Sequence, residues 1–135
     1  MELDERLVQL RIDIIERNLK EIREISKLKE MSYRDELALK HALLECIEAC
    51  VDIANHIIAT KGFRRPVDYK DVFRVLVENG IIDEEFSQRL QGMVGFRKVH
   101  RYAYVDPKKL LEFASEDIKD IERFVRVVLR LIKTS

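Results

Sequence analysis

The feature that most constrains the fold is a hydrophobic repeat of three to four residues, which runs through most of the chain. The repeat is broadest between residues 33 and 59, where the apolar positions are Leu39, Leu43, Cys46, Ile47, Cys50, Val51, Ala54, Ile57 and Ile58. Residues at this spacing share one face of an α-helix, so the segment is predicted to be a central helix that is buried along most of its length. A chain of 135 residues with only 4 Gly and 2 Pro also has the composition of a helical bundle.

Capping residues divide this repeat into separate helices. Ser32, followed three residues later by Asp35, predicts the start of the central helix, and Gly62 predicts its end. The residue pair Asp106 and Pro107 predicts the start of a last helix that runs to about residue 133, with its stripe at Leu110, Leu111, Ala114, Ile118, Ile121, Val125, Val128, Leu129 and Ile132.

Three further helices complete the expected fold. A narrower stripe predicts a first helix over residues 3–29, through Leu3, Leu7, Leu10, Ile14, Ile15, Leu19 and Ile22. Asp68 is expected to cap a short helix over residues 69–78, and Asp83 is expected to cap the helix that follows. We therefore expect an all-α fold, an up-down four-helix bundle with one additional short helix, in one domain of residues 1–135. The first helix is free to pack on this bundle or along a second subunit.

Charge and cysteine content narrow the function classes. The 25 Lys and Arg residues balance the 25 Asp and Glu residues, which argues against a protein that coats nucleic acid or membrane by bulk attraction. Cys46 and Cys50 lie one turn apart among apolar neighbours and are expected to be buried thiols. The chain shows neither a signal peptide nor an apolar run of membrane length, which indicates a cytoplasmic protein.

Residues 95–104 gather the densest chemistry in the sequence. Arg97 and His100 are three positions apart, where a helix that faced only the core would carry apolar residues, and Lys98, Arg101 and Tyr102 lie beside them. A guanidinium binds phosphate and an imidazole transfers protons near neutral pH, so Arg97 and His100 are the candidate catalytic pair. In the simpler alternative the two side chains make cap and surface contacts at a helix end.

A polar line on the central helix also admits two interpretations. Glu48, Asp52 and His56 recur every four residues beside the apolar face. They either form a solvated surface, with His56 bonded to Asp52, or line the cleft that receives Arg97 and His100. The basic loop that follows, with Lys61, Arg64 and Arg65, is likewise either solvated or in contact with a substrate.

The sequence resembles the HepT-like members of the HEPN superfamily, which are small helical ribonuclease toxins. The resemblance covers about residues 34–132 and follows the family's order in four segments, which are residues 48–58 (EACVDIANHII), 66–73 (PVDYKDVF), 80–82 (GII) and 93–97 (MVGFR). His100 and Tyr102 keep the family's His-x-Tyr ending. The chain departs from the family between Arg97 and His100, where it has two residues instead of four, and where Lys98 stands in place of the usual Asn.

The resemblance implies an enzyme and its partners. It implies an endoribonuclease, a homodimer whose two motifs face one cleft, and a partner nucleotidyltransferase antitoxin that adenylylates Tyr102. The sequence has no metal-ligand spacing, Walker loop or dinucleotide fingerprint, so neither a metal nor a nucleotide cofactor is expected. RNA is the implied substrate, because the attacking group in such a cleavage is the ribose 2′-hydroxyl. The shortened motif leaves a second interpretation open, a HEPN module that binds nucleotide or RNA without cutting and still pairs with the transferase.

Overall fold

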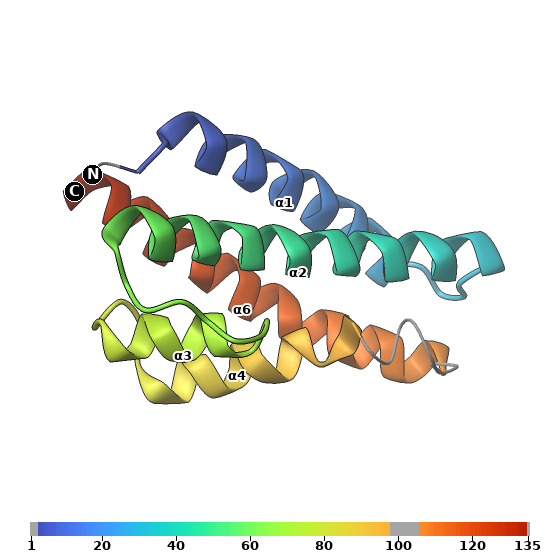
Figure 1. Ribbon diagram of the computed structural model, residues 1–135. Helices are drawn as coiled ribbons and strands as arrows, with labels where there is room; N and C mark the ends of the chain where they lie inside the picture. The colour runs from blue at the N-terminus through green and yellow to red at the C-terminus, as the bar shows by residue number, and fades with distance from the viewer. Residues whose placement is uncertain (1–2, 98–105, 135) are drawn as a thin grey trace.

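The computed structural model describes residues 3–97 and 106–134, and within these residues all regular structure is α-helical (Figure 1). The helices are α1 (Glu5–Ser26), α2 (Tyr33–Lys61), α3 (Asp71–Glu78), α4 (Glu84–Val94) and α6 (Pro107–Thr134). Helices α1 and α4 run in one direction and α2 and α6 in the other, while the short α3 lies against α4. The predicted all-α, up-down bundle of four main helices and one short helix is confirmed.

The predicted caps explain where the helices begin and end. Ser32 Oγ accepts from the Asp35 N–H at 3.1 Å while the Asp35 carboxylate accepts from the Ser32 N–H at 2.9 Å, a complete capping box. Helix α2 ends at Gly62, whose φ of 70° is a left-handed conformation that favours glycine. Asp83 accepts from the Phe86 N–H, and Asp106 accepts from the Lys108 N–H, at the starts of α4 and α6.

The buried stripe of α1 differs from the predicted one in its first half. Val8 and Ile12 are buried, whereas Leu10 is 52% exposed. Leu10 lies about 200° around the helix from Val8 and therefore faces away from the core. Ile15, Leu19 and Ile22 are buried as predicted, and α1 packs mainly on α2 and also touches α6. The sequence left open whether α1 packs on the bundle or along a second subunit, and in the structure it packs on the bundle.

Helix α3 begins two residues later than predicted. Asp68 is not its N-cap, because Lys70 holds that position without a side-chain capping bond. The Asp68 carboxylate still accepts from the Asp71 N–H at 2.7 Å. The helix itself starts only at Asp71, since that residue's own carboxylate accepts from the Val67 N–H at 2.9 Å and holds residues 67–70 in a turn. Tyr69 lies in this turn and is exposed at the surface.

One continuous core joins all five described helices. All nine apolar positions predicted for α2 are buried, and among them Cys46 and Cys50 are fully buried free thiols, as expected. Burial raises the pKa of Cys46 to about 12, with a smaller contribution from Glu45, and burial likewise raises the pKa of Cys50. Phe73 and Phe124 pack edge to face with ring centroids 5.9 Å apart. Phe124 was missed by the predicted stripe of α6, whereas Leu129, which was included, is exposed.

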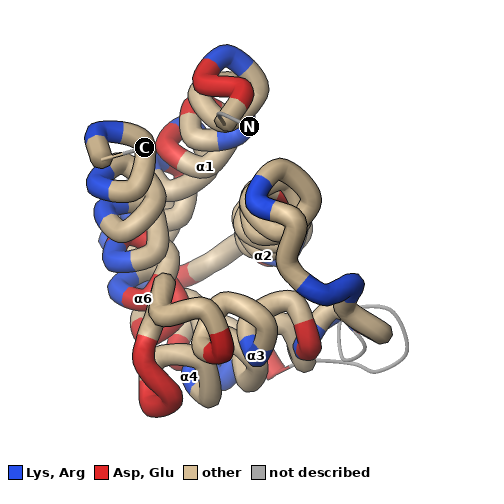
Figure 2. The backbone as a smooth tube through the Cα atoms, turned by 60° about the vertical axis from the view of Figure 1, so that its left-hand side comes forward, with Lys and Arg blue, Asp and Glu red and all other residues tan. Residues whose placement is uncertain are grey.

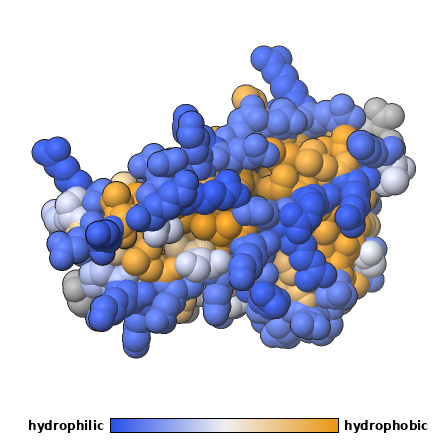
Figure 3. All heavy atoms as spheres, turned by 180° about the vertical axis from the view of Figure 1, so that it is seen from behind, coloured by the Kyte–Doolittle hydropathy of each residue, from blue (hydrophilic) through white to orange (hydrophobic). Residues whose placement is uncertain are grey.

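The surface is not uniformly polar. Viewed from the side opposite to Figure 1, apolar atoms reach the solvent between charged side chains (Figure 3). Large apolar residues that are substantially exposed include Leu28, Tyr33, Leu37, Val67 and Phe113. None of the described helices combines the length and the apolar character needed to cross a bilayer.

Candidate functional site

The C-terminal end of α4 fixes the position of Arg97. Helix α4 ends at Val94, Gly95 forms its C-cap, and Phe96 and Arg97 are again in helical conformation. Phe96 is buried and packs against Phe113 of α6, with ring centroids 6.3 Å apart. The buried ring anchors the backbone directly before Arg97, so the start of the Arg97 side chain has a defined place on the bundle.

The guanidinium of Arg97 is held from two sides. Its Nε donates to Glu48 Oε1 on α2 at 3.2 Å, and its Cζ lies 4.0 Å from the ring centroid of Tyr69. A carboxylate in the plane of the guanidinium and an aromatic ring on its face together restrict the rotation of a long side chain. The Arg97 side chain is 26% exposed and so still reaches the solvent. The bundle thus brings together Glu48 and Arg97, which are far apart in sequence.

A small notch lies beside this pair. It is lined by Glu48, Val51, Asp52, Tyr69 and Arg97, and its volume is about 20 Å³. That volume is close to the minimum that one water molecule needs, so neither a phosphate nor a nucleobase fits inside it. A ligand of Arg97 would therefore have to lie outside the notch. Glu48 and Asp52, two members of the predicted polar line, are next to Arg97.

His56, the third member of that line, lies in an adjoining groove between α1 and α2. This groove of about 310 Å³ is lined by Leu7, Val8, Arg11, Asp52, Ile53, Asn55 and His56. His56 Nε2 accepts from the Asp4 N–H at 3.0 Å, while Asp52 pairs with Arg11 at 3.3 Å. The expected His56–Asp52 bond is therefore replaced by contacts that each residue makes with α1 or the residue preceding it. The structure joins Asp52, but not His56, to the notch at Arg97.

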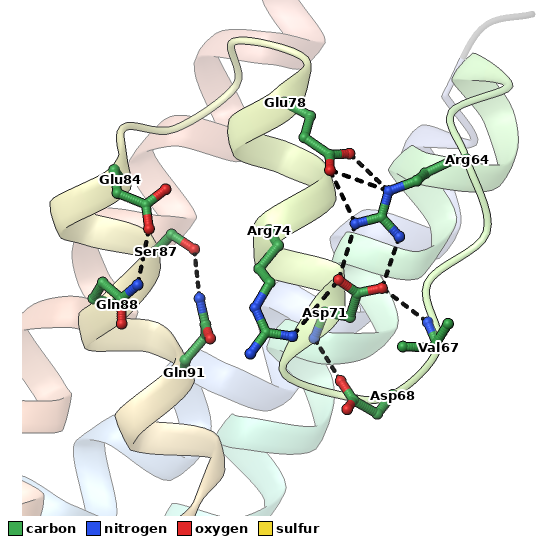
Figure 4. Close-up of polar contacts among 10 residues, drawn as sticks. All are labelled: Arg64, Val67, Asp68, Asp71, Arg74, Glu78, Glu84, Ser87, Gln88 and Gln91. Carbon is green, nitrogen blue, oxygen red and sulfur yellow. Dashed lines mark hydrogen bonds and ion pairs between the residues drawn. The ribbon is translucent and has the colours of Figure 1, made fainter.

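The basic loop after α2 is held by Arg64 (Figure 4). Its Nη1 and Nη2 donate to the Asp71 carboxylate at 2.8 and 2.9 Å, and its Nε donates to Glu78 at 2.8 Å. Hydrogen bonds from Arg64, followed by the Val67 N–H, lower the pKa of Asp71, while bonds to Asp71 and then Glu78 raise the pKa of Arg64. We refer to Arg64, Asp71 and Glu78 as the loop clip. Arg64 was grouped with the candidate substrate contacts, but it is engaged within the fold.

Several predicted site residues lie outside the part of the chain that the structure describes. They are Lys98, His100, Arg101 and Tyr102. In the described part, the sequence analysis missed Tyr69. Its signal was an aromatic residue at the end of a basic loop, and the structure gives it 44% exposure directly under Arg97.

Comparisons with known proteins show which family this chain belongs to. The chain matches the family described as "Ribonuclease HepT-like" over residues 10–128. It is 31% identical to the mRNA nuclease HepT of Shewanella oneidensis, over 87% of this chain and 92% of that protein. It is also similar to the putative RNase YutE of Bacillus subtilis, at 27% identity over 73% of this chain and 70% of that one.

Solved structures of related proteins have a similar fold. A Shewanella oneidensis HEPN toxin, described as tri-AMPylated and in complex with the MNT antitoxin, superposes with a TM-score of 0.83 at 26% identity, covering 92% of this chain and 97% of that chain. A structure of YutE, described as a cytosolic protein of unknown function, superposes with a TM-score of 0.85 at 21% identity and covers 99% and 94% of the two chains, which shows a shared fold. The family match and the 31% identity to a nuclease of this kind extend over most of the sequence, and this chain therefore belongs to the HepT-like ribonuclease family.

Proposed function

We propose that this protein is the toxin of a toxin–antitoxin pair, a cytoplasmic, metal-independent endoribonuclease that works as a homodimer. The observation that carries the proposal is the constrained guanidinium of Arg97, held by Glu48 and Tyr69 on a chain of the HepT-like family. An arginine restrained in this way is suited to bind a phosphate, because little side-chain freedom is lost when the ligand arrives.

The remaining donors of Arg97 are available for that task. A guanidinium has five N–H groups, and the Nε–H is the one engaged by Glu48. Among residues 3–97 and 106–134, the terminal nitrogens of Arg97 have no hydrogen-bonded acceptor. They would hold two oxygens of one phosphate and stabilise the charge that grows on it during cleavage.

His100 supplies the proton transfer in this proposal. An imidazole takes the proton of the ribose 2′-hydroxyl, the 2′-oxygen attacks phosphorus, and the bond from phosphorus to the 5′-oxygen breaks. A proton delivered to the leaving 5′-oxygen completes the step and leaves a 2′,3′-cyclic phosphate and a 5′-hydroxyl. A single imidazole does not readily act as base and acid in one step, so the two copies of His100 in a symmetric dimer would divide the roles.

Tyr102 would be the point of control. Two residues from His100, it corresponds to the family's His-x-Tyr tyrosine, and a related HEPN toxin is described as tri-AMPylated and bound to its MNT antitoxin. A nucleotidyltransferase that attached AMP groups to Tyr102 would place anionic phosphates near Arg97. Those phosphates would occupy its donors and block access for RNA.

The test is RNA cleavage by the purified protein in EDTA. The proposal expects products with 2′,3′-cyclic phosphate ends, no cleavage of DNA, and loss of at least about 100-fold in rate for His100→Ala and for Arg97→Lys. Arg97→Lys keeps the charge but loses the two-pronged donor geometry. Equal cleavage by wild type and His100→Ala excludes His100 as the catalytic group, and a protein that stays monomeric at assay concentration excludes the shared cleft.

A second function rests on the shortened motif. Arg97 and His100 are separated by Lys98 and Val99 alone, which favours a module that binds RNA or nucleotide and pairs with the transferase without cutting. This alternative expects RNA binding that is weakened by Arg97→Ala, with no cleavage by wild type under any condition that supports binding.

A further inference from the structure

Tyr69 lies directly beside Arg97, the arginine that we propose binds phosphate. One face of its ring is covered by the Arg97 guanidinium, 4.0 Å from the ring centroid. The residue is nevertheless 44% exposed, so a substantial part of it beyond that covered face meets the solvent. Exposed aromatic rings in positively charged sites are surfaces on which unpaired bases stack.

The loop clip holds Tyr69 in this place. Arg64 joins the start of the loop to Asp71 and Glu78 on α3, and Asp71 also accepts from the Val67 N–H at 2.9 Å (Figure 4). Asp71 is only 5% exposed, which makes this a buried and well-connected anchor two residues after Tyr69. The ring is therefore presented by a fixed turn, and stacking a base on it requires little further ordering.

Positive charge is concentrated in the stretch of sequence that contains Tyr69. Lys and Arg residues gather at the end of α2 and on the segment that follows it (Figure 2). Lys61 is the last residue of α2, and Arg64, Arg65 and Lys70 lie between α2 and α3. Arg64 is bonded to Asp71 and Glu78 in the loop clip. Arg65 and Lys70 are exposed and form no ion pair within the described residues. The Lys70 ammonium also approaches the end of α4, since a Cβ added at Gly95 would lie 4.0 Å from its Nζ. Cations around an aromatic ring suit a single nucleic-acid strand.

The size and charge of the notch indicate where the base would lie. A volume of about 20 Å³ excludes a base from the space between Arg97 and α2. Glu48 and Asp52 border the same space and repel phosphate there. The exposed part of Tyr69 that Arg97 does not cover remains open to a ligand.

We propose that Tyr69 stacks a nucleobase adjacent to the phosphate held by Arg97, and that Arg65 and Lys70 contact the backbone of the same RNA strand. This inference rests on the proposed RNA substrate and adds a base-binding subsite to it. The Arg97 guanidinium, the Tyr69 ring and the base would form one stack. The loop clip would hold Tyr69, which lies in the middle of that stack.

The experiment separates base stacking from phosphate binding. Two uncleavable probes are compared by fluorescence anisotropy, a 2′-O-methyl oligouridylate of eight residues and the same backbone carrying no bases. The wild-type protein is expected to bind the base-bearing probe about fivefold or more tightly than the abasic one. Tyr69→Ala should lower that ratio by at least about threefold, while Tyr69→Phe should keep it.

Two controls make the result specific. Tyr33→Ala removes another exposed tyrosine, at the start of α2, and should leave the ratio unchanged. If Tyr69 only supported Arg97, Tyr69→Ala would weaken both probes equally and the ratio would not move, which overturns the inference. Failure of the wild-type protein to bind either probe, or to prefer the base-bearing one, overturns it as well.

The proposed function is judged by a different readout. Since neither probe can be cleaved, the probe ratio does not depend on His100 or on catalysis. A protein that prefers the base-bearing probe through Tyr69 but never cleaves RNA would support the subsite and reject the nuclease. Cleavage with an unchanged probe ratio in Tyr69→Ala would do the reverse.

Discussion

Two arginines of this bundle show how the same side chain is used for structure and for a site. Arg64 directs its fork and its Nε to two carboxylates, Asp71 and Glu78, with distances from 2.8 Å. Arg97 has one carboxylate, Glu48, at 3.2 Å, and the ring of Tyr69 on its face. Arg64 is thus satisfied by the fold, whereas Arg97 is oriented by the fold and keeps donors for a ligand.

The difference lies in what each carboxylate contributes. Asp71 is buried and also accepts a backbone N–H, so it belongs to the construction of the α2–α3 loop. Glu48 is about half exposed and has one bond to Arg97, so an incoming phosphate can compete with it. The two arginines therefore differ in the number and the burial of their acceptors, and in the aromatic ring that covers Arg97.

The largest expected effect is on the structural side of this comparison. Asp71→Ala removes both bonds to the Arg64 fork and leaves the Val67 N–H without its acceptor. We expect the free energy of unfolding to fall by about 3 kcal/mol, the lower end for a broken buried pair, because Arg64 itself is 45% exposed and regains water. Urea denaturation at pH 7 measures the loss.

The matched control is Glu78→Ala, which removes the exposed acceptor of the same arginine. It should cost about 1 kcal/mol or less. The sign of the pH dependence adds a second check, because Arg64 lowers the pKa of Asp71 in the folded state. The Asp71 contribution is therefore present above the unfolded pKa of about 4 and is lost as pH falls. A wild-type advantage that stayed constant from pH 7 down to pH 2 would contradict this account.

The helices were predictable from sequence because their signals are local. Ser32 and Asp35 form the predicted capping box, and the α2 stripe is buried at every position that the repeat indicated. The predictions of buried residues were wrong where two neighbouring helical stripes were both partly apolar. Leu10 fits a spacing of three to four residues from Leu7, but the core selected the neighbouring stripe through Val8 and Ile12.

The site was less predictable because it depends on contacts distant in sequence. The sequence could suggest Glu48 and Asp52 as neighbours of Arg97 from their helical spacing and the family resemblance. It had no means to distinguish Arg64 from Arg65, since the partners of Arg64 lie 7 and 14 residues away and only the turn at residues 67–70 brings them close. Tyr69 gained its place beside Arg97 through the same turn.

Asp117 extends the comparison to a carboxyl that no arginine within residues 3–97 and 106–134 pairs with. Burial, followed by the nearby charges of Asp120 and Glu116, raises the pKa of Asp117 to about 7, and Arg89 is bonded to Asp120 at 3.0 Å. In the unfolded chain this carboxyl ionises near pH 4, so its burial destabilises the fold increasingly as pH rises from about 4 to 7. Asp117→Asn should therefore stabilise the protein by about 1–3 kcal/mol at pH 8 and have little effect at pH 4.

Thermal unfolding of the Asp117 variant at the two pH values measures this difference. Glu112→Gln removes an exposed carboxylate from the same helix and should shift the melting temperature by a small amount that is equal at both pH values. A stabilisation by Asp117→Asn that was as large at pH 4 as at pH 8 would show that packing, rather than ionisation, distinguishes the two side chains.

The smallest expected effect concerns the replaceable carboxylate of Arg97. Glu48→Gln keeps an oxygen that can accept from the Arg97 Nε–H but removes the negative charge beside the proposed phosphate. If Glu48 positions Arg97 and competes with RNA, KM for RNA should fall about twofold to fivefold while kcat changes less, because the ground-state repulsion is relieved and the orientation is kept. Glu78→Gln, next to Arg64, should leave both constants unchanged. A fall in kcat for Glu48→Gln with unchanged KM would instead place its charge in the transition state, and Arg97 would then be oriented as rigidly as Arg64.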